Sequence, residues 1–127
     1  MERQYCASSY VIDFENAKVL LMYNRKLNKW LQPGGHIIGL ETPIEACIRE
    51  VKEETGLDLI SYKLKGIVFY PSFCGGEDEF VYFYTSDAFS GNLIECNEGD
   101  LVWIDDDKIF DLSLWEGDKL IFEWFKK

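Results

Sequence analysis

Alternation of apolar and polar residues indicates β-strands along most of the chain. Residues 5–14 alternate loosely and are rich in Tyr, Val and Ile, and residues 18–23 form an apolar run suited to a central strand. By the same criteria we expect strands at 30–32, 36–38, 62–70, 80–86 and 101–104. The longest connections predicted between them are an acidic turn at 74–79 and a loop over 87–100.

A helix is predicted over residues 43–55. Thr42 is a favoured N-cap, Pro43 takes the first helical position, and Glu45 completes a T-x-x-E capping box. Gly56 is the glycine expected just after a helix C-terminus. Apolar residues recur at helical spacing and should form the buried stripe, which comprises Ile44, Cys47, Ile48, Val51 and Thr55.

The order of these elements indicates an α+β fold. Strands precede and follow the one long helix, and a second, amphipathic helix is expected over 118–125. We therefore expect either an α+β arrangement or a mixed-sheet sandwich. A length of 127 residues is typical of a single domain spanning 1–127.

The composition restricts the partners and the compartment. A net charge of −10 disfavours a nucleic-acid polymer, whose backbone requires clusters of Lys and Arg. No segment approaches the roughly 20 apolar residues of a membrane span, and the N-terminus does not resemble a signal peptide. The four cysteines form no C-x-x-C pair, which favours reduced thiols in a cytoplasmic protein. The oligomeric state stays open, with a homodimer among the alternatives.

Three glutamates crowd one flank of the predicted helix. Glu50 lies three residues before Glu53 and four before Glu54, so their carboxylates are neighbours. Like charges at this spacing destabilise a bare helix by a few tenths of a kcal/mol per pair, roughly. A solvated acidic face with Arg49 and Lys52 as ion-pair partners is one interpretation. A Mg²⁺ site is the other, because that ion prefers several hard oxygen ligands.

The spacing of these residues resembles the signature of a known family. Residues 35–57 read Gly, five residues, Glu, seven residues, then Arg-Glu-Val-Lys-Glu-Glu-Thr-Gly-Leu. This pattern is similar to the Nudix box at every defined position. The resemblance implies a mixed sheet between helices, an α/β/α sandwich, and a Mg²⁺- or Mn²⁺-dependent hydrolase. The substrates of such hydrolases are small nucleotides in which a nucleoside diphosphate is linked to another moiety.

The resemblance also implies roles for individual residues. Arg49 orients the glutamates, and Glu41 lies in the outer shell of the site or serves a second metal. Glu53 is the first choice for the catalytic base and Glu98 the second. The metal ligands that it implies are the Gly35 carbonyl and the carboxylates of Glu50, Glu53, Glu54 and Glu98.

Residues outside the box bear on the substrate. Trp115 and Asp118 resemble the Trp-x-Asp-Asp segment of family members that act on oxidised purine triphosphates, in which Trp stacks on the base and the acids read its edge. His36, inside the box, is expected to lie in a loop or contact phosphate rather than to ligate a metal. The complete box, Glu98 and the Trp115/Asp118 pair favour a MutT-like pyrophosphohydrolase of 8-oxo-dGTP or a related triphosphate. A nucleotide sugar or ADP-ribose as substrate, and a non-catalytic nucleotide-binding module, are the alternatives.

Overall fold

The structure is a computed structural model that describes residues 3–72, 77–96 and 99–112. Three of the predicted site residues, Glu98, Trp115 and Asp118, lie outside these ranges, as does the predicted helix over 118–125.

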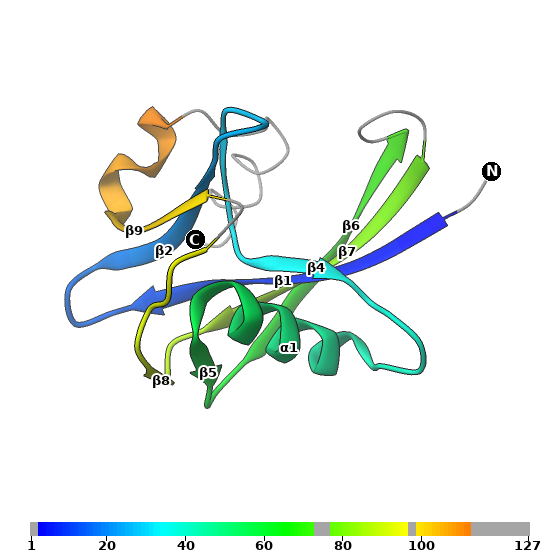
Figure 1. The fold of residues 1–127 in the computed structure, drawn as a ribbon, viewed down its shortest axis with the longest axis horizontal. Helices are drawn as coiled ribbons and strands as arrows, with labels where there is room; N and C mark the ends of the chain where they lie inside the picture. Colours follow the sequence, from blue (N-terminus) through cyan, green and yellow to red (C-terminus); the bar gives the residue numbers. More distant parts are fainter. Residues whose placement is uncertain (1–2, 73–76, 97–98, 113–127) are drawn as a thin grey trace.

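A seven-stranded mixed sheet dominates the described chain (Figure 1). Its continuous order is β3-β2-β1-β7-β6, with β4 also paired to β1 and β9 to β2. Only β1 and β7 run parallel among the pairs that build this sheet in the described ranges. Its strands are β1 (Arg3–Asp13), β2 (Lys18–Asn24), β3 (Lys29–Leu31), β4 (Gly34–His36), β6 (Lys63–Ser72), β7 (Glu77–Ser86) and β9 (Gly99–Asp105).

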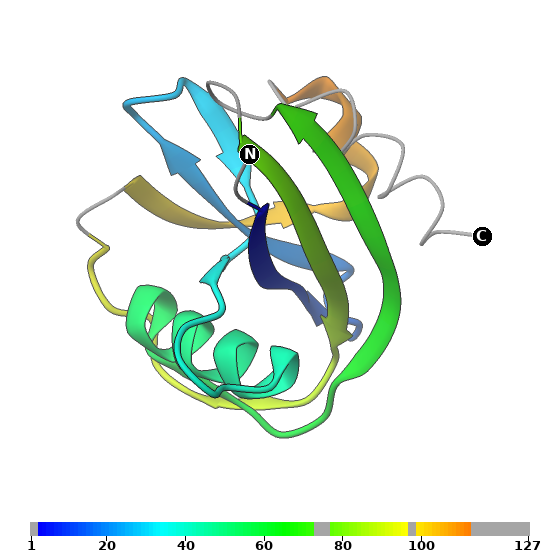
Figure 2. The same ribbon diagram turned by 90° about the vertical axis from the view of Figure 1, so that its right-hand side faces the viewer.

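The remaining elements of the described ranges are one long helix, a small two-stranded sheet and a short 3₁₀ helix. Their bounds are α1 (Pro43–Thr55), β5 (Leu57–Leu59), β8 (Phe89–Gly91) and the 3₁₀ helix (Asp106–Asp111). Helix α1 packs against β1, β4 and β5, below the curved sheet in Figure 2. A mixed sheet with a helix confirms the predicted α+β class.

Strand β1 has two faces that serve different purposes. Ala7 and Val11 are fully buried and pack with residues of α1, among them Val51. Tyr10 points to the opposite face and packs with Phe83 in a second cluster. Because side chains alternate along a strand, the even-numbered residues earlier in β1 also lie on the face away from α1.

Helix α1 begins and ends where the sequence predicts. The Glu45 amide donates to Thr42 Oγ1 at 3.3 Å, and the Thr42 amide donates to Glu45 Oε1 at 2.8 Å. Gly56 has a φ of 86°, and its amide donates to the Lys52 carbonyl at 2.9 Å. The predicted stripe is confirmed for three residues, joined by an unpredicted alanine: the fully buried residues are Ala46, Cys47, Val51 and Thr55. Ile44 and Ile48 are half-buried at its edge.

The prediction of a strand at 36–38 was wrong by two residues. Strand β4 comprises Gly34–His36, and it lies so close to β1 that a Cβ on Gly34 would be 2.3 Å from Ser8 Cβ. Two consecutive glycines suggest a turn from sequence, but here the absence of a side chain at Gly34 permits close strand pairing.

The predicted connections over 74–79 and 87–100 were too long. Residues 77–79 belong to β7, and Phe89–Gly91 forms β8, which pairs with the unpredicted β5. Glu79, at the polar start of β7, pairs with Tyr70 of β6. Such pairing between strands extends β7 through polar residues whose sequence alone does not indicate a strand. Within the described ranges, no helix is long and apolar enough to cross a membrane.

We expect Thr42→Ala to destabilise the protein by about 1 kcal/mol, because the Glu45 amide loses its side-chain acceptor. Thr42→Ser keeps a hydroxyl and should cost much less. Urea denaturation of both variants measures the difference. Equal stability of the alanine and serine variants would contradict the role of the capping box.

Candidate functional site

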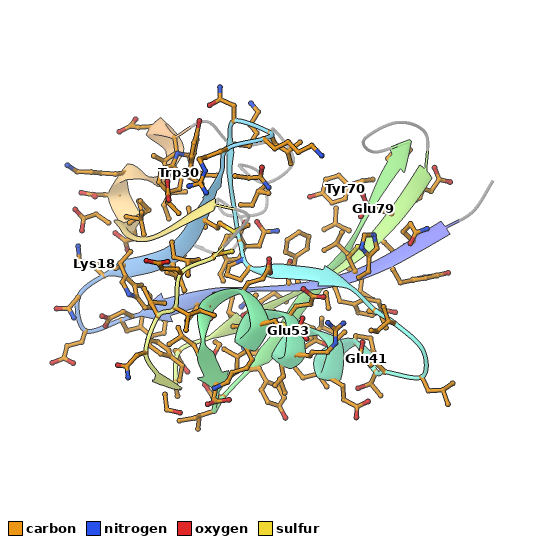
Figure 3. The ribbon with its side chains drawn as sticks, viewed as in Figure 1. Lys18, Trp30, Glu41, Glu53, Tyr70 and Glu79 are labelled. Atoms are coloured by element: carbon orange, nitrogen blue, oxygen red, sulfur yellow. The ribbon has the colours of Figure 1, made fainter. Side chains whose placement is uncertain are left out.

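Arg49 stands at the centre of the acidic cluster. Its Nε and Nη2 donate to the two carboxylate oxygens of Glu41 at 2.6 and 3.0 Å. Its Nη1 donates to Glu50 Oε1 at 2.7 Å and to Glu53 Oε2 at 3.3 Å, and Nη2 also donates to the His36 carbonyl at 3.0 Å. One planar guanidinium thus fixes three carboxylates relative to the backbone of β4. Figure 3 labels Glu41 and Glu53 in this region.

These hydrogen bonds hold the charges in place. The bonds to Glu41 and then to Glu50 raise the pKa of Arg49 above its ordinary value. In turn, the bond from Arg49, followed by the Ile38 amide, lowers the pKa of Glu41. Glu41 is therefore ionised at neutral pH and is held by the guanidinium, in agreement with a supporting position.

The two glycines of β4 face the acidic flank of α1. The Gly34 amide donates to Glu54 Oε1 at 2.8 Å. A Cβ on Gly35 would lie 2.5 Å from Glu50 Cδ and 2.6 Å from its Oε2. The missing side chain at Gly35 therefore lets the carboxylate of Glu50 rest against the strand backbone. The sequence indicated Gly35 as a site residue but not Gly34. The adjacency of Gly34 to Gly35 was the feature of the sequence that could have indicated it.

The donor atoms of this cluster suit a divalent cation. The carboxylates of Glu41, Glu50 and Glu53 bind one guanidinium, and that of Glu54 accepts from the Gly34 amide. The five charged groups together carry a net charge of −3 (4 negative, 1 positive). Carboxylate oxygens are hard ligands of the kind that Mg²⁺ and Mn²⁺ prefer. The side chain of Glu53 is 60% exposed whereas that of Glu50 is 20% exposed, so Glu53 is the more accessible to a ligand.

A pocket of about 220 Å³ opens on the other side of β4. Gly34, Gly35 and His36 contribute to its wall, together with the apolar side chains of Val81 and Phe83. The strand that touches the acidic helix thus also borders the pocket. The polar residues that line the pocket are Cys6, Ser8, Gln32, His36, Tyr70 and Glu79.

The structure brings together most of the predicted site. Arg49 contacts Glu41, Glu50 and Glu53, Glu50 lies against Gly35, and Glu54 joins through Gly34. His36 lies between the cluster, which its carbonyl contacts, and the pocket.

Of the polar residues that line the pocket, the sequence had indicated only His36, and Cys6 and Glu79 are among those that were missed. Glu79 stood in a predicted acidic turn, and only its place on β7 beside β1 reveals that it faces Cys6.

Comparisons with known proteins identify the relatives of the chain. A family model described as NUDIX domain matches residues 3–125. The protein named "Uncharacterized Nudix hydrolase YvcI" from Bacillus subtilis is 33% identical over 114 residues, which cover 87% of this chain and 72% of that protein. A "Putative 8-oxo-dGTP diphosphatase 3" from Mycobacterium tuberculosis is 27% identical over 100 residues, 76% of this chain and 46% of that protein.

A solved structure supports the same grouping. A MutT protein from Bacillus halodurans superposes with a TM-score of 0.86 at 29% sequence identity, over 94% of this chain and 80% of its own. Proteins with a NUDIX domain generally use divalent metal ions, which agrees with the donor set found here.

We expect Gly35→Ala to weaken Mn²⁺ binding by about 10–100-fold, the range for disturbing the orientation of a metal ligand. The new Cβ would displace the Glu50 carboxylate, a movable group, so stability should change little. Titration followed by the paramagnetic resonance signal of free Mn²⁺ measures the affinity.

Gly34→Ala provides the contrast, because its Cβ would meet the Ala7 carbonyl at 2.5 Å and should destabilise the β1–β4 pair. Unchanged Mn²⁺ affinity in Gly35→Ala would exclude Glu50 from the metal site.

Proposed function

The chain belongs to the Nudix hydrolase family, as the spacing over residues 35–57 predicted, and we propose that it hydrolyses a nucleoside triphosphate, with an oxidised purine such as 8-oxo-dGTP favoured. The products are the nucleoside monophosphate and pyrophosphate. The family membership makes the chain a pyrophosphohydrolase, and what is proposed is the substrate and the role of each residue.

One observation carries the proposal: the acidic cluster and the pocket share the backbone of β4. Glu50 and Glu54 touch Gly35 and Gly34, and the same two glycines border the pocket. A nucleotide needs these two environments side by side, one for a metal-bound polyphosphate and one for a nucleoside. The apolar walls and convergent polar groups of the pocket suit a base.

The glutamates of α1 provide the metal site of the proposal. Glu50, Glu53, Glu54 and the Gly35 carbonyl would hold Mg²⁺ or Mn²⁺. When bound, the ion neutralises phosphate charge and polarises a phosphorus toward attack by water. Arg49 holds two of the ligands, Glu50 and Glu53, at 2.7 and 3.3 Å, and so orients them before the substrate arrives.

Glu53 is the proposed general base. It is the more exposed of the two glutamates that Arg49 holds on α1, so water can reach it. Its carboxylate would accept the proton of the attacking water as the water oxygen bonds to phosphorus and the anhydride bond between the α- and β-phosphates breaks. Glu98 is the second candidate for this role and for a metal ligand.

The preference for an oxidised purine is supported by relatives and by two residues of this chain. The M. tuberculosis relative is named as a putative 8-oxo-dGTP diphosphatase, and the B. halodurans structure is that of a MutT protein. Trp115 and Asp118 are the proposed groups for stacking on the base and for accepting its N–H donors.

A nucleotide sugar or ADP-ribose is the second candidate substrate. A third possibility is a non-catalytic module, but every defined position of the box is present, and the loss of such residues would be its sign.

Product analysis over a panel of nucleotides tests the substrate proposal. We expect 8-oxo-dGTP with Mg²⁺ to yield 8-oxo-dGMP and pyrophosphate, with a higher kcat/KM than dGTP, separated by ion-exchange chromatography. ADP-ribose and UDP-glucose are the comparison substrates. Two monophosphates without pyrophosphate would favour the second candidate, and no turnover of any triphosphate with Mg²⁺ or Mn²⁺ would refute the proposal.

We expect Glu53→Gln to reduce kcat by about 100- to 10,000-fold, the usual contribution of a general base. Glu45→Gln is the matched control, since it makes the same change on the same helix and glutamine preserves a capping box. Steady-state kinetics on both variants measure the ratio. Full activity in Glu53→Gln would remove Glu53 from catalysis.

A further inference from the structure

Three metal-ligating side chains meet on the face of the sheet away from α1. Cys6 of β1 is directly opposite His36 of β4 and Val81 of β7. Glu79 lies two residues before Val81, so it points to the same face as Cys6. The register of three strands, rather than any sequence motif, therefore places a thiol, an imidazole and a carboxylate in one group.

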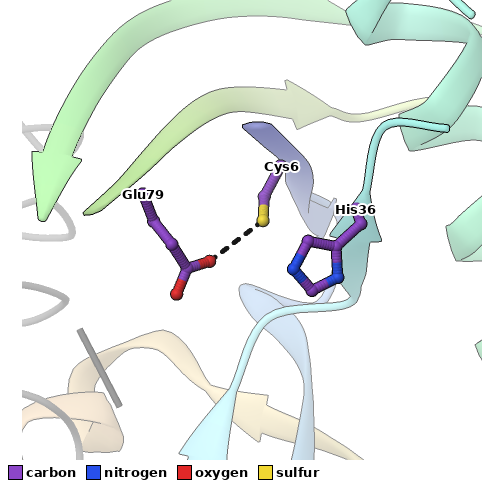
Figure 4. A group of neighbouring side chains, drawn as sticks. All are labelled: Cys6, His36 and Glu79. Carbon is purple, nitrogen blue, oxygen red and sulfur yellow. Dashed lines mark hydrogen bonds between the residues drawn. The ribbon is translucent and has the colours of Figure 1, made fainter. Parts of the chain in front are cut away.

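The distances within this group are short. Cys6 Sγ donates to Glu79 Oε1 at 3.0 Å, and one ligand atom from each of the three residues lies within 4.8 Å of the others. Figure 4 shows the sulfur of Cys6 between the carboxylate of Glu79 and the ring of His36. Tetrahedral Zn²⁺, with bonds of about 2.0–2.3 Å, holds its ligand atoms about 3.5 Å apart, so movements of roughly 1 Å would complete the geometry.

We propose that Cys6, His36 and Glu79 form a second metal site, for a borderline-soft divalent cation of the Zn²⁺ class. Sulfur and imidazole ligands favour such an ion over Mg²⁺, whereas the all-oxygen cluster on α1 has the opposite preference. Three protein ligands leave a fourth position, which opens into the pocket that the three residues line. This proposal does not depend on the substrate of the α1 site.

The protonation state of the Cys6 thiol makes metal binding at this site depend on pH. Burial, and then the neighbouring Glu79, raise the pKa of Cys6, so the thiol is protonated in the metal-free protein. Metal binding would form the sulfur–metal bond and release that proton to solvent. His36 is exposed, so an ion can reach the group from the pocket side.

Titration with Co²⁺, which reports on sulfur ligation, tests the site. The protein is used without a polyhistidine tag and in excess Mg²⁺, so that the α1 cluster is occupied. We expect one tightly bound Co²⁺ with a sulfur-to-cobalt charge-transfer band in the near ultraviolet, abolished by Zn²⁺ displacement. Absence of the band at saturating Co²⁺ would overturn the proposal.

Variants assign the ligands. Cys6→Ser should lose the band, whereas Cys96→Ser, which changes a thiol 3.4 Å from Met22 Sδ, should keep it. His36→Asn and Glu79→Gln change side chains that are less buried than Cys6, so the circular dichroism spectrum should stay unchanged. Both variants should bind Zn²⁺ more weakly in calorimetry. Retention of the band in Cys6→Ser, or of full Zn²⁺ affinity in both other variants, would refute the assignment.

Discussion

The acidic site depends on the set of hydrogen bonds that the Arg49 guanidinium donates. Without a cation among them, Glu41, Glu50 and Glu53 would repel one another at contact distance. The guanidinium donates to all three and to the His36 carbonyl, and so links the helix, the loop before it and strand β4. A compact lysine ammonium lacks this fork geometry. The arginine therefore fixes where the carboxylates point, and a divalent ion would complete the neutralisation.

Strand β4 connects the acidic cluster to the pocket. On one side its glycines touch Glu50 and Glu54, and on the other they border the pocket. A Cβ at Gly34 would clash with the backbone of β1, and a Cβ at Gly35 would displace the movable carboxylate of Glu50. The close packing of β4 against both β1 and α1 places the candidate metal site and the pocket side by side.

The two candidate metal sites differ in the ligands that the fold supplies. Helix α1 gathers oxygen donors from residues close in sequence, because positions three and four apart share a face. The group of Cys6, His36 and Glu79 draws its donors from three strands that are up to 73 residues apart. The first site was visible as a motif, and the second required the strand register.

The sequence by itself determined the helix, its caps and the glutamate spacing, because all three depend on interactions within about one helical turn. It also gave the class of most strands through residue alternation, though not the ends of β4 and β7. Only the tertiary structure decided the pairing of Gly34 with β1, the position of Glu79 beside Cys6, and the common wall of cluster and pocket. Those features arise from contacts between strands distant in the chain, whose register leaves no local trace in residue pattern.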